Sequence, residues 1–164
     1  MSDRVILLPL ATIEGRHLLG LIDEFLHVID LAQHDADDGA ARRLTPDPYP
    51  EDRLAGAEFA DQTRDDLLDR RMHDALRVRR GLSGFDVDDD PAGGDALLPR
   101  DVLIEDDELD AWLRTLTAMR LVMASRLGVD GVEAPDPDDP RLGVYDWLGY
   151  RLDGLVQAAD EHDL

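Results

Sequence analysis

Three aspartates spaced two residues apart are the first group in this chain that could bind a metal ion. Asp86, Asp88 and Asp90 match the first three ligand positions of an EF-hand calcium loop. However, Pro91 stands where such a loop needs glycine, and Leu97 stands where it needs a bidentate glutamate. We therefore expect at most weak, non-specific cation binding by this acidic segment and predict no dedicated metal site.

Other catalytic patterns are also incomplete. The serines, Ser2, Ser83 and Ser125, lack the setting of a nucleophile elbow. His27 and His34 are seven residues apart on a predicted helix, which is too far for the i, i+4 histidine pair of a zinc protease. The chain has no cysteine, which excludes thiolate catalysis, disulfides and zinc–thiolate sites. We expect a non-enzymatic protein without catalytic residues, cofactor or metal.

Arginines concentrate in one segment, residues 70–80, which contains five of them. One interpretation is a contact surface for an acidic partner or for phosphate. The other is that these side chains neutralise neighbouring acids and the negative end of a helix. We favour the second interpretation because the segment has no interleaved aromatic residues on which bases could stack.

The overall charge excludes several classes of partner. The chain has 38 acidic and 17 basic residues, which gives a net charge of −21. Such a charge repels nucleic-acid phosphates and anionic lipid headgroups, so we expect neither nucleic acid nor membrane as a partner. No apolar stretch reaches the roughly 18–20 residues that span a bilayer, and no signal peptide is recognisable. These features predict a cytoplasmic protein.

Apolar residues at spacings of three and four predict the helices that must carry any site. Four helices are expected, over residues 12–33, about 50–80 with a break near the middle, 106–127 and 140–160. Asp106 is the predicted N-cap of the third helix, and Gly128 its C-terminal glycine. In the first helix, Gly15 and Gly20 each weaken helix propensity by about 1 kcal/mol relative to alanine. Packing must therefore hold that helix in place.

Two short extended runs, residues 5–10 and 102–104, could pair as a small β ribbon. A shift of ninety-four positions (102 minus 8) superposes Leu8 on Val102 and Glu14 on Glu108, so each run opens a similar strand–turn–helix unit. The alternative is that any such unit would look alike without pairing. Residues 34–53 and 81–101 read as loops, the second acidic and mobile. The expected fold is mainly α, a compact bundle-like single domain over residues 1–164.

Two segments carry more specific patterns. The first runs from Trp112 through Arg120 to Arg126-Leu127-Gly128, and the second joins Asp139-Pro140-Arg141 to Tyr145-Asp146-Trp147-Leu148. Together with residues 44–49 and Glu58-Phe59, they make the chain resemble the actinobacterial AosR-type family over about residues 5–156.

This resemblance implies a mostly helical cytoplasmic protein that regulates oxidative-stress transcription by binding a sigma factor. Family genes often lie near one for a ClpS protease adaptor, so an accessory role in Clp-type proteolysis is the alternative. Direct DNA binding is a second alternative, which the net charge disfavours. The redox switch attributed to paired cysteines in that family cannot carry over, since this chain has no cysteine. Homodimerisation stays open.

Six residues of the two segments form a candidate fold or interaction motif: Trp112, Arg120, Arg126, Tyr145, Asp146 and Trp147. Burial of each aromatic side chain would contribute about 2–3 kcal/mol. We expect Arg120 or Arg126 to pair with Asp146 or Asp66 across a helix contact, which would fix the register of the two helices.

Overall fold

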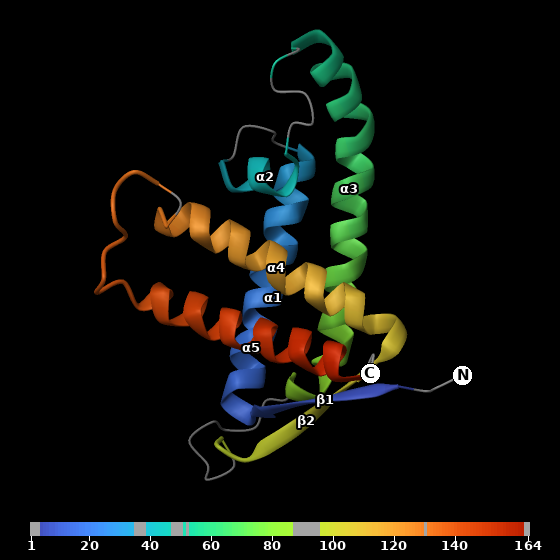
Figure 1. The fold of residues 1–164 in the computed structure, drawn as a ribbon, viewed down its shortest axis with the longest axis vertical. Helices are drawn as coiled ribbons and strands as arrows, with labels where there is room; N and C mark the ends of the chain where they lie inside the picture. The colour runs from blue at the N-terminus through green and yellow to red at the C-terminus, as the bar shows by residue number, and fades with distance from the viewer. Residues whose placement is uncertain are drawn as a thin grey trace.

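The computed structural model describes residues 4–34, 39–46, 51, 53–86, 96–129 and 131–162, with no side chains described at 40, 41, 53–62 and 162. Its elements follow in the order β1 (Val5–Ala11), α1 (Thr12–His34), α2 (Gly39–Leu44), α3 (Arg53–Gly81), η1 (Ser83–Phe85), β2 (Pro99–Glu105), α4 (Asp106–Leu127) and α5 (Pro140–His162). The mainly helical fold with a two-stranded ribbon is confirmed. In Figure 1 the ribbon lies at one end, α1 and α3 extend away from it, and α4 and α5 cross α1 side by side.

The two predicted extended runs form an antiparallel pair that is longer than expected. Leu8 lies opposite Val102, and the ladder continues from Val5 with Glu105 to Ala11 with Pro99. Alternate residues face the core, because successive side chains of a strand point to opposite sides. Residues 6, 8 and 10 of β1 are buried, whereas residues 5, 7 and 9 are exposed.

Each strand leads directly into a helix, and the two junctions are equivalent. The first residue of α1, Thr12, donates its backbone N–H to the Leu98 carbonyl at 3.0 Å. The first residue of α4, Asp106, donates its backbone N–H to the Arg4 carbonyl, also at 3.0 Å. The shift of ninety-four positions superposes Thr12 on Asp106 and Arg4 on Leu98, so each unit donates the same hydrogen bond to the other. These bonds satisfy amide groups that a helix N-terminus otherwise leaves unpaired.

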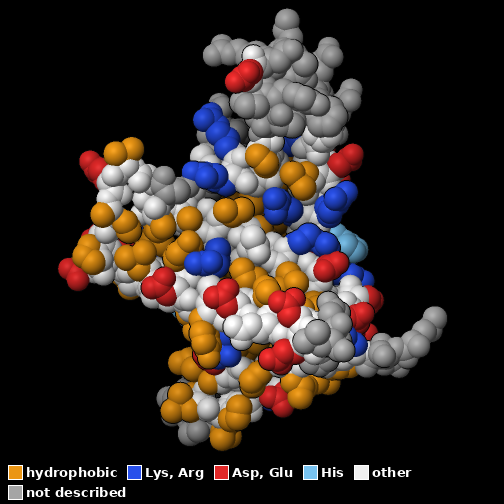
Figure 2. Space-filling model, in the orientation of Figure 1, with side chains coloured by type: hydrophobic (Ala, Val, Ile, Leu, Met, Phe, Trp, Pro, Cys, Tyr) orange, Lys and Arg blue, Asp and Glu red, His pale blue; other side chains and the backbone are white. Residues whose placement is uncertain are grey.

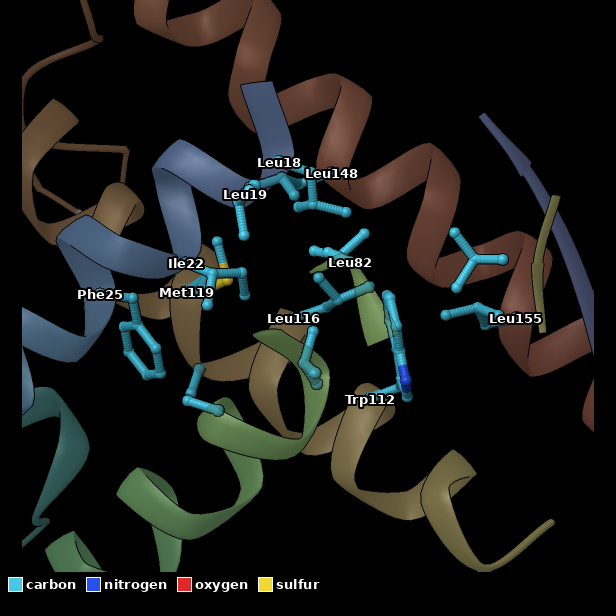
Figure 3. Close-up of a cluster of buried hydrophobic side chains, with 14 of the residues drawn as sticks. Leu18, Leu19, Ile22, Phe25, Leu82, Trp112, Leu116, Met119, Leu148 and Leu155 are labelled. Atoms are coloured by element: carbon cyan, nitrogen blue, oxygen red, sulfur yellow. The ribbon is translucent and has the colours of Figure 1, made fainter. Parts of the chain in front are cut away.

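The core is one cluster to which every layer contributes (Figure 3). Figure 3 shows side chains of α1, α4 and α5 converging, with Leu82, the residue that directly follows α3, among them. Its largest fully buried members include Trp112, Ile22, Leu116 and Leu148. The ribbon closes one end of this cluster with its inner face.

The predicted caps of α4 and α5 agree with the structure at all but one position. Asp106 is the first residue of α4 and not its N-cap, a position that Glu105 holds without a side-chain hydrogen bond. Gly128 has a left-handed φ of 69°, as the sequence predicts for a helix C-terminus. At the start of α5, Asp139 Oδ1 accepts the backbone N–H of Arg141 at 2.9 Å, which confirms the predicted cap.

The predicted loop over residues 34–53 is partly wrong, because it contains α2. Leu44 ends that short helix and is fully buried, and its carbonyl accepts a hydrogen bond from Arg71 Nε at 3.1 Å. The break expected within the following helix is also wrong, since α3 runs unbroken from Arg53 to Gly81. The burial of Leu44 and its hydrogen bond from Arg71 therefore hold α2 in place, within a segment whose composition favours a loop.

The acidic loop predicted for residues 81–101 is shorter than expected. Its first part forms η1, whose Phe85 is buried at 3% exposure, and its last part, from Pro99, belongs to β2. The Phe85 ring packs against Gly15, where an added Cβ would overlap it. Residues 87–95, including most of the aspartate triplet, lie outside the described part of the chain.

Candidate functional site

Trp112 belongs to the core. It is 1% exposed on α4, and its ring lies so close to Gly81 that a Cβ added there would be 3.0 Å from Cζ2. Figure 3 shows the indole beside Leu116, with Leu155 of α5 nearby. The structure therefore places this motif residue where α3, α4 and α5 pack together.

Arg120 and Tyr145 connect α4 to α5. The Arg120 guanidinium carbon lies 4.2 Å from the centre of the Tyr145 ring, a cation–π geometry. The same guanidinium covers Gly149, where an added Cβ would be 2.9 Å from Cζ. No ion pair joins Arg120 to Asp146 or Asp66 among the described residues, so the contact between the helices is made by a ring instead of a carboxylate.

Trp147 takes part in a hydrogen-bond network around Glu14. Its Nε1–H donates to Glu14 Oε1 at 2.9 Å, while Arg151 Nη2 donates to both carboxylate oxygens at 2.9 Å. The Ala11 backbone N–H donates to Oε2, which is the carboxylate half of a capping box at the start of α1. Burial alone would raise the pKa of Glu14, but these donors outweigh it and lower the pKa below 4.5.

Arg126 and Asp146, the two remaining motif residues, are both exposed on their helices. Neither forms an ion pair with a described residue of the other helix. The six-residue motif is thus divided by the structure into packing residues and two residues at the surface.

The arginines in the segment of α3 over residues 70–80 fall into two groups, those that form ion pairs and those that do not. Arg79 pairs with Asp23 at 2.6 Å, and Arg77 pairs with Asp107 at 3.8 Å, as the neutralisation hypothesis predicts. Arg70 and Arg80 are exposed and form no ion pair with any described residue. Figure 2 shows basic side chains gathered over α3 and the adjoining part of α4, on a chain that is otherwise acidic. The neutralisation hypothesis therefore covers only part of the segment.

A cavity of about 380 Å³ lies beside these arginines, between α3 and α4. Its charged lining consists of Arg70, Arg71, Asp74 and Arg114, and Phe25 of α1 contributes to its apolar lining. Asp74 is 6% exposed and binds Arg114 in a bidentate pair, with Nε–Oδ2 at 2.8 Å and Nη2–Oδ1 at 3.2 Å. The site holds more positive than negative charge.

The outer face of the ribbon is a second candidate. Leu7 and Leu103 lie opposite each other in the ladder and are 59% and 61% exposed, with Val5 beside them at 42%. We call these three residues the ribbon patch. Exposed acids flank it at Asp101 and Glu105, and hydrophobic side chains continue along this end of the molecule in Figure 2. Contiguous exposed apolar side chains of this kind mark interaction surfaces.

Neither a metal centre nor a membrane segment is found in the part of the chain that the structure describes. No group of three or more potential ligands from histidine and the acidic residues converges there. None of the helices in that part combines the length and apolar character that crossing a bilayer requires.

Sequence reasoning missed the ribbon patch, and it considered an anion contact at residues 70–80 without foreseeing the cavity that Arg70 and Arg71 line. The apolar run of β1 contained a signal for the ribbon patch, because a two-stranded ribbon can bury only one of its faces and both faces here are apolar. The cavity left no such signal, since Asp74 and Arg114 are forty residues apart and meet only through the packing of α3 on α4.

Comparison with known proteins places the chain in a family without assigning a function. No curated protein and no solved structure matches it significantly. A family model described as a domain of unknown function, DUF2017, matches residues 2–159, which is nearly the whole chain, and the protein therefore belongs to that family.

Proposed function

We propose that this protein is a non-enzymatic regulator that acts by binding another protein through the ribbon patch. The observation that carries the proposal is the exposed pair Leu7 and Leu103, matched in register on a face that a solvated ribbon would normally keep polar. Covering an exposed leucine would contribute about 1.5–3 kcal/mol to binding.

The chemistry around the patch indicates a basic partner. Asp101 and Glu105 border the patch, and the net charge of −21 attracts positively charged surfaces over a distance of several ångströms. The DNA-binding face of a sigma factor is one such basic surface, because it must attract phosphates. We therefore propose a sigma factor of oxidative-stress transcription as the partner, in the cytoplasm, in line with the resemblance to the AosR-type family. Without cysteines, any control of this binding differs from a thiol switch.

In the alternative function, the ribbon patch binds a component of Clp-type proteolysis. The two functions therefore share a binding surface and differ in the partner. Direct DNA binding would instead require the arginines of α3, because the ribbon patch offers no positive charge and its acidic border repels phosphates. Separate assays with purified sigma factors, Clp components and duplex DNA at low salt distinguish the three functions.

The experiment compares Leu103→Gln with Leu31→Gln. Both leucines are exposed, at 61% and 47%, but Leu31 lies on α1. Binding of purified actinobacterial sigma factors is measured by biolayer interferometry with the full chain. We expect L103Q to weaken binding about tenfold, equivalent to about 1.4 kcal/mol, while L31Q changes it little.

The double variant L7Q/L103Q should weaken binding further, and the affinity of the unmodified protein should fall as salt rises. Equal losses in L103Q and L31Q, or no sigma-factor binding by the unmodified protein, would contradict the proposal. Binding of Clp components through the same leucines, without sigma-factor binding, would contradict the sigma-factor proposal and support the alternative role in Clp-type proteolysis.

A further inference from the structure

The cavity between α3 and α4 concentrates positive charge in a chain that is strongly negative elsewhere. Three guanidinium groups line it, from Arg70, Arg71 and Arg114, against a single lining carboxylate, Asp74. Asp74 is engaged by Arg114 on both oxygens, so its charge is already compensated. Arg70 has no ion-pair partner among the described residues, which leaves its guanidinium available to an anion.

A buried polar atom beside the same cavity lacks a hydrogen-bond partner. Thr115 is 2% exposed, and its Oγ1 forms no hydrogen bond with any described group although the residue lines the cavity. Buried hydroxyl groups in folded proteins usually have a hydrogen-bond partner, so one without a partner is a departure from normal packing.

Most of the remaining lining is apolar. It is formed by Phe25, Leu67, Leu113, Ala118 and Leu121. Small-molecule sites combine such walls with a few polar groups, and they typically measure roughly 300–1,000 Å³. At about 380 Å³, this cavity suits the lower end of that range. An inorganic anion would leave the apolar walls uncovered, and a neutral apolar molecule would leave the guanidinium groups unused.

We propose that this cavity binds a small amphiphilic anion, with an acidic head group on Arg70 and Arg71 and an apolar body against Phe25 and Leu113. Arginine suits the head group because its planar donors match a carboxylate or phosphate bidentately. The site lies on α3 and α4, away from the ribbon patch, so the inference goes beyond the proposed protein-binding function and can succeed or fail independently of it.

The proposal is tested with three soluble probes on the full chain. Octanoate has both the head group and the apolar body, 1-octanol has only the body, and inorganic phosphate has only the charge. Binding is followed by isothermal titration calorimetry and by NMR shifts of the Thr115 and Leu113 methyl groups. We expect saturable binding of octanoate at this cavity and at least about tenfold weaker binding of the other two probes, which corresponds to about 1.4 kcal/mol.

Two arginines on the same helix provide a matched pair of variants. Arg70→Gln removes a charge from the cavity lining, whereas Arg80→Gln removes the same charge from an exposed site outside it. We expect R70Q to weaken octanoate binding about tenfold and R80Q to leave it within about twofold of the unmodified protein. Both arginines are exposed, so both variants should fold.

Thr115→Val supplies a control at the cavity wall, because valine keeps the shape and removes a hydroxyl that is not exposed to the cavity. The variant should be at least as stable as the unmodified protein and should bind octanoate within about twofold of it, whereas R70Q weakens binding. Failure of octanoate to bind, equal effects of R70Q and R80Q, or phosphate binding as tight as octanoate binding would each overturn the proposal.

Discussion

At the residue scale, the Glu14 carboxylate joins three segments of the chain. It caps α1 by accepting the Ala11 N–H, and it accepts hydrogen bonds from Trp147 and Arg151 of α5. Arg151 also donates to the Pro9 carbonyl of β1 at 3.2 Å. Hydrogen bonds to a charged group are stronger than neutral ones, so this single acid ties the ribbon and α1 to α5.

We predict that Glu14→Gln lowers the free energy of unfolding at pH 7 by about 1–2 kcal/mol, because charge-assisted hydrogen bonds become neutral ones. The folded-state pKa of Glu14 lies below its ordinary value of 4.5, so the unfolded state binds more protons in this range. The stability that the charged Glu14 provides is therefore complete above pH 4.5 and is lost as the pH falls through the lowered pKa.

Urea denaturation of both proteins at several pH values measures this difference. The gap between the unmodified protein and E14Q should be constant near neutral pH and close progressively in acid. A gap that stays constant down to the lowest accessible pH would show that the network does not depend on the charge of Glu14.

At the element scale, helix contacts depend on side chains that fit into glycine positions. Phe85 of η1 packs on Gly15 of α1, and Arg120 of α4 packs on Gly149 of α5. Each glycine lets a large group approach the helix backbone where any Cβ would collide with it. The helix-propensity cost of glycine is therefore compensated at these two positions, whereas Gly20 has no neighbour within 4 Å of an added Cβ.

We predict opposite effects of the same substitution at two positions of α1. Gly15→Ala should lower the free energy of unfolding by about 1–3 kcal/mol, because the new methyl group collides with the buried Phe85 ring. Gly20→Ala should raise the free energy of unfolding by up to about 1 kcal/mol, since only helix propensity changes there. Thermal and chemical denaturation measure both changes. Stabilisation by G15A would mean that η1 does not pack on α1 as described.

At the scale of the whole molecule, charge repulsion opposes folding. A net charge of −21 on 164 residues favours expanded states, and added salt screens this repulsion. Exposed ion pairs between elements, such as Arg79 with Asp23, contribute little in comparison.

We predict that raising sodium chloride from about 0.01 M to 1 M, where the screening length falls from roughly 30 Å to 3 Å, stabilises the protein. A gain of about 1–2 kcal/mol would raise Tm by roughly 2–8 °C. Calcium and magnesium chloride at equal ionic strength should give equal increases, because Pro91 and Leu97 interrupt the calcium-like spacing of Asp86, Asp88 and Asp90. A much larger effect of calcium would contradict the expectation of non-specific binding.

Much of the fold was predictable because helix periodicity and local caps are properties of short segments. The helix over residues 12–33 differs from α1 by one residue at its end, and the Asp139-Pro140 start of α5 is as expected. Two of the errors, α2 and η1, occur where one buried side chain, Leu44 or Phe85, orders a segment with loop composition. Such anchors depend on distant partners that no local pattern contains.

The sequence by itself determined the charge, the helical class, the strand–helix repeat and the lack of cysteine chemistry, because these follow from composition and periodicity. Only the tertiary structure decided that Leu7 and Leu103 meet on an exposed face, and that Arg70 and Thr115 line one cavity beside the Asp74–Arg114 pair. The physical reason is that a surface or cavity is made by residues far apart in the chain. Their proximity depends on how helices and strands pack.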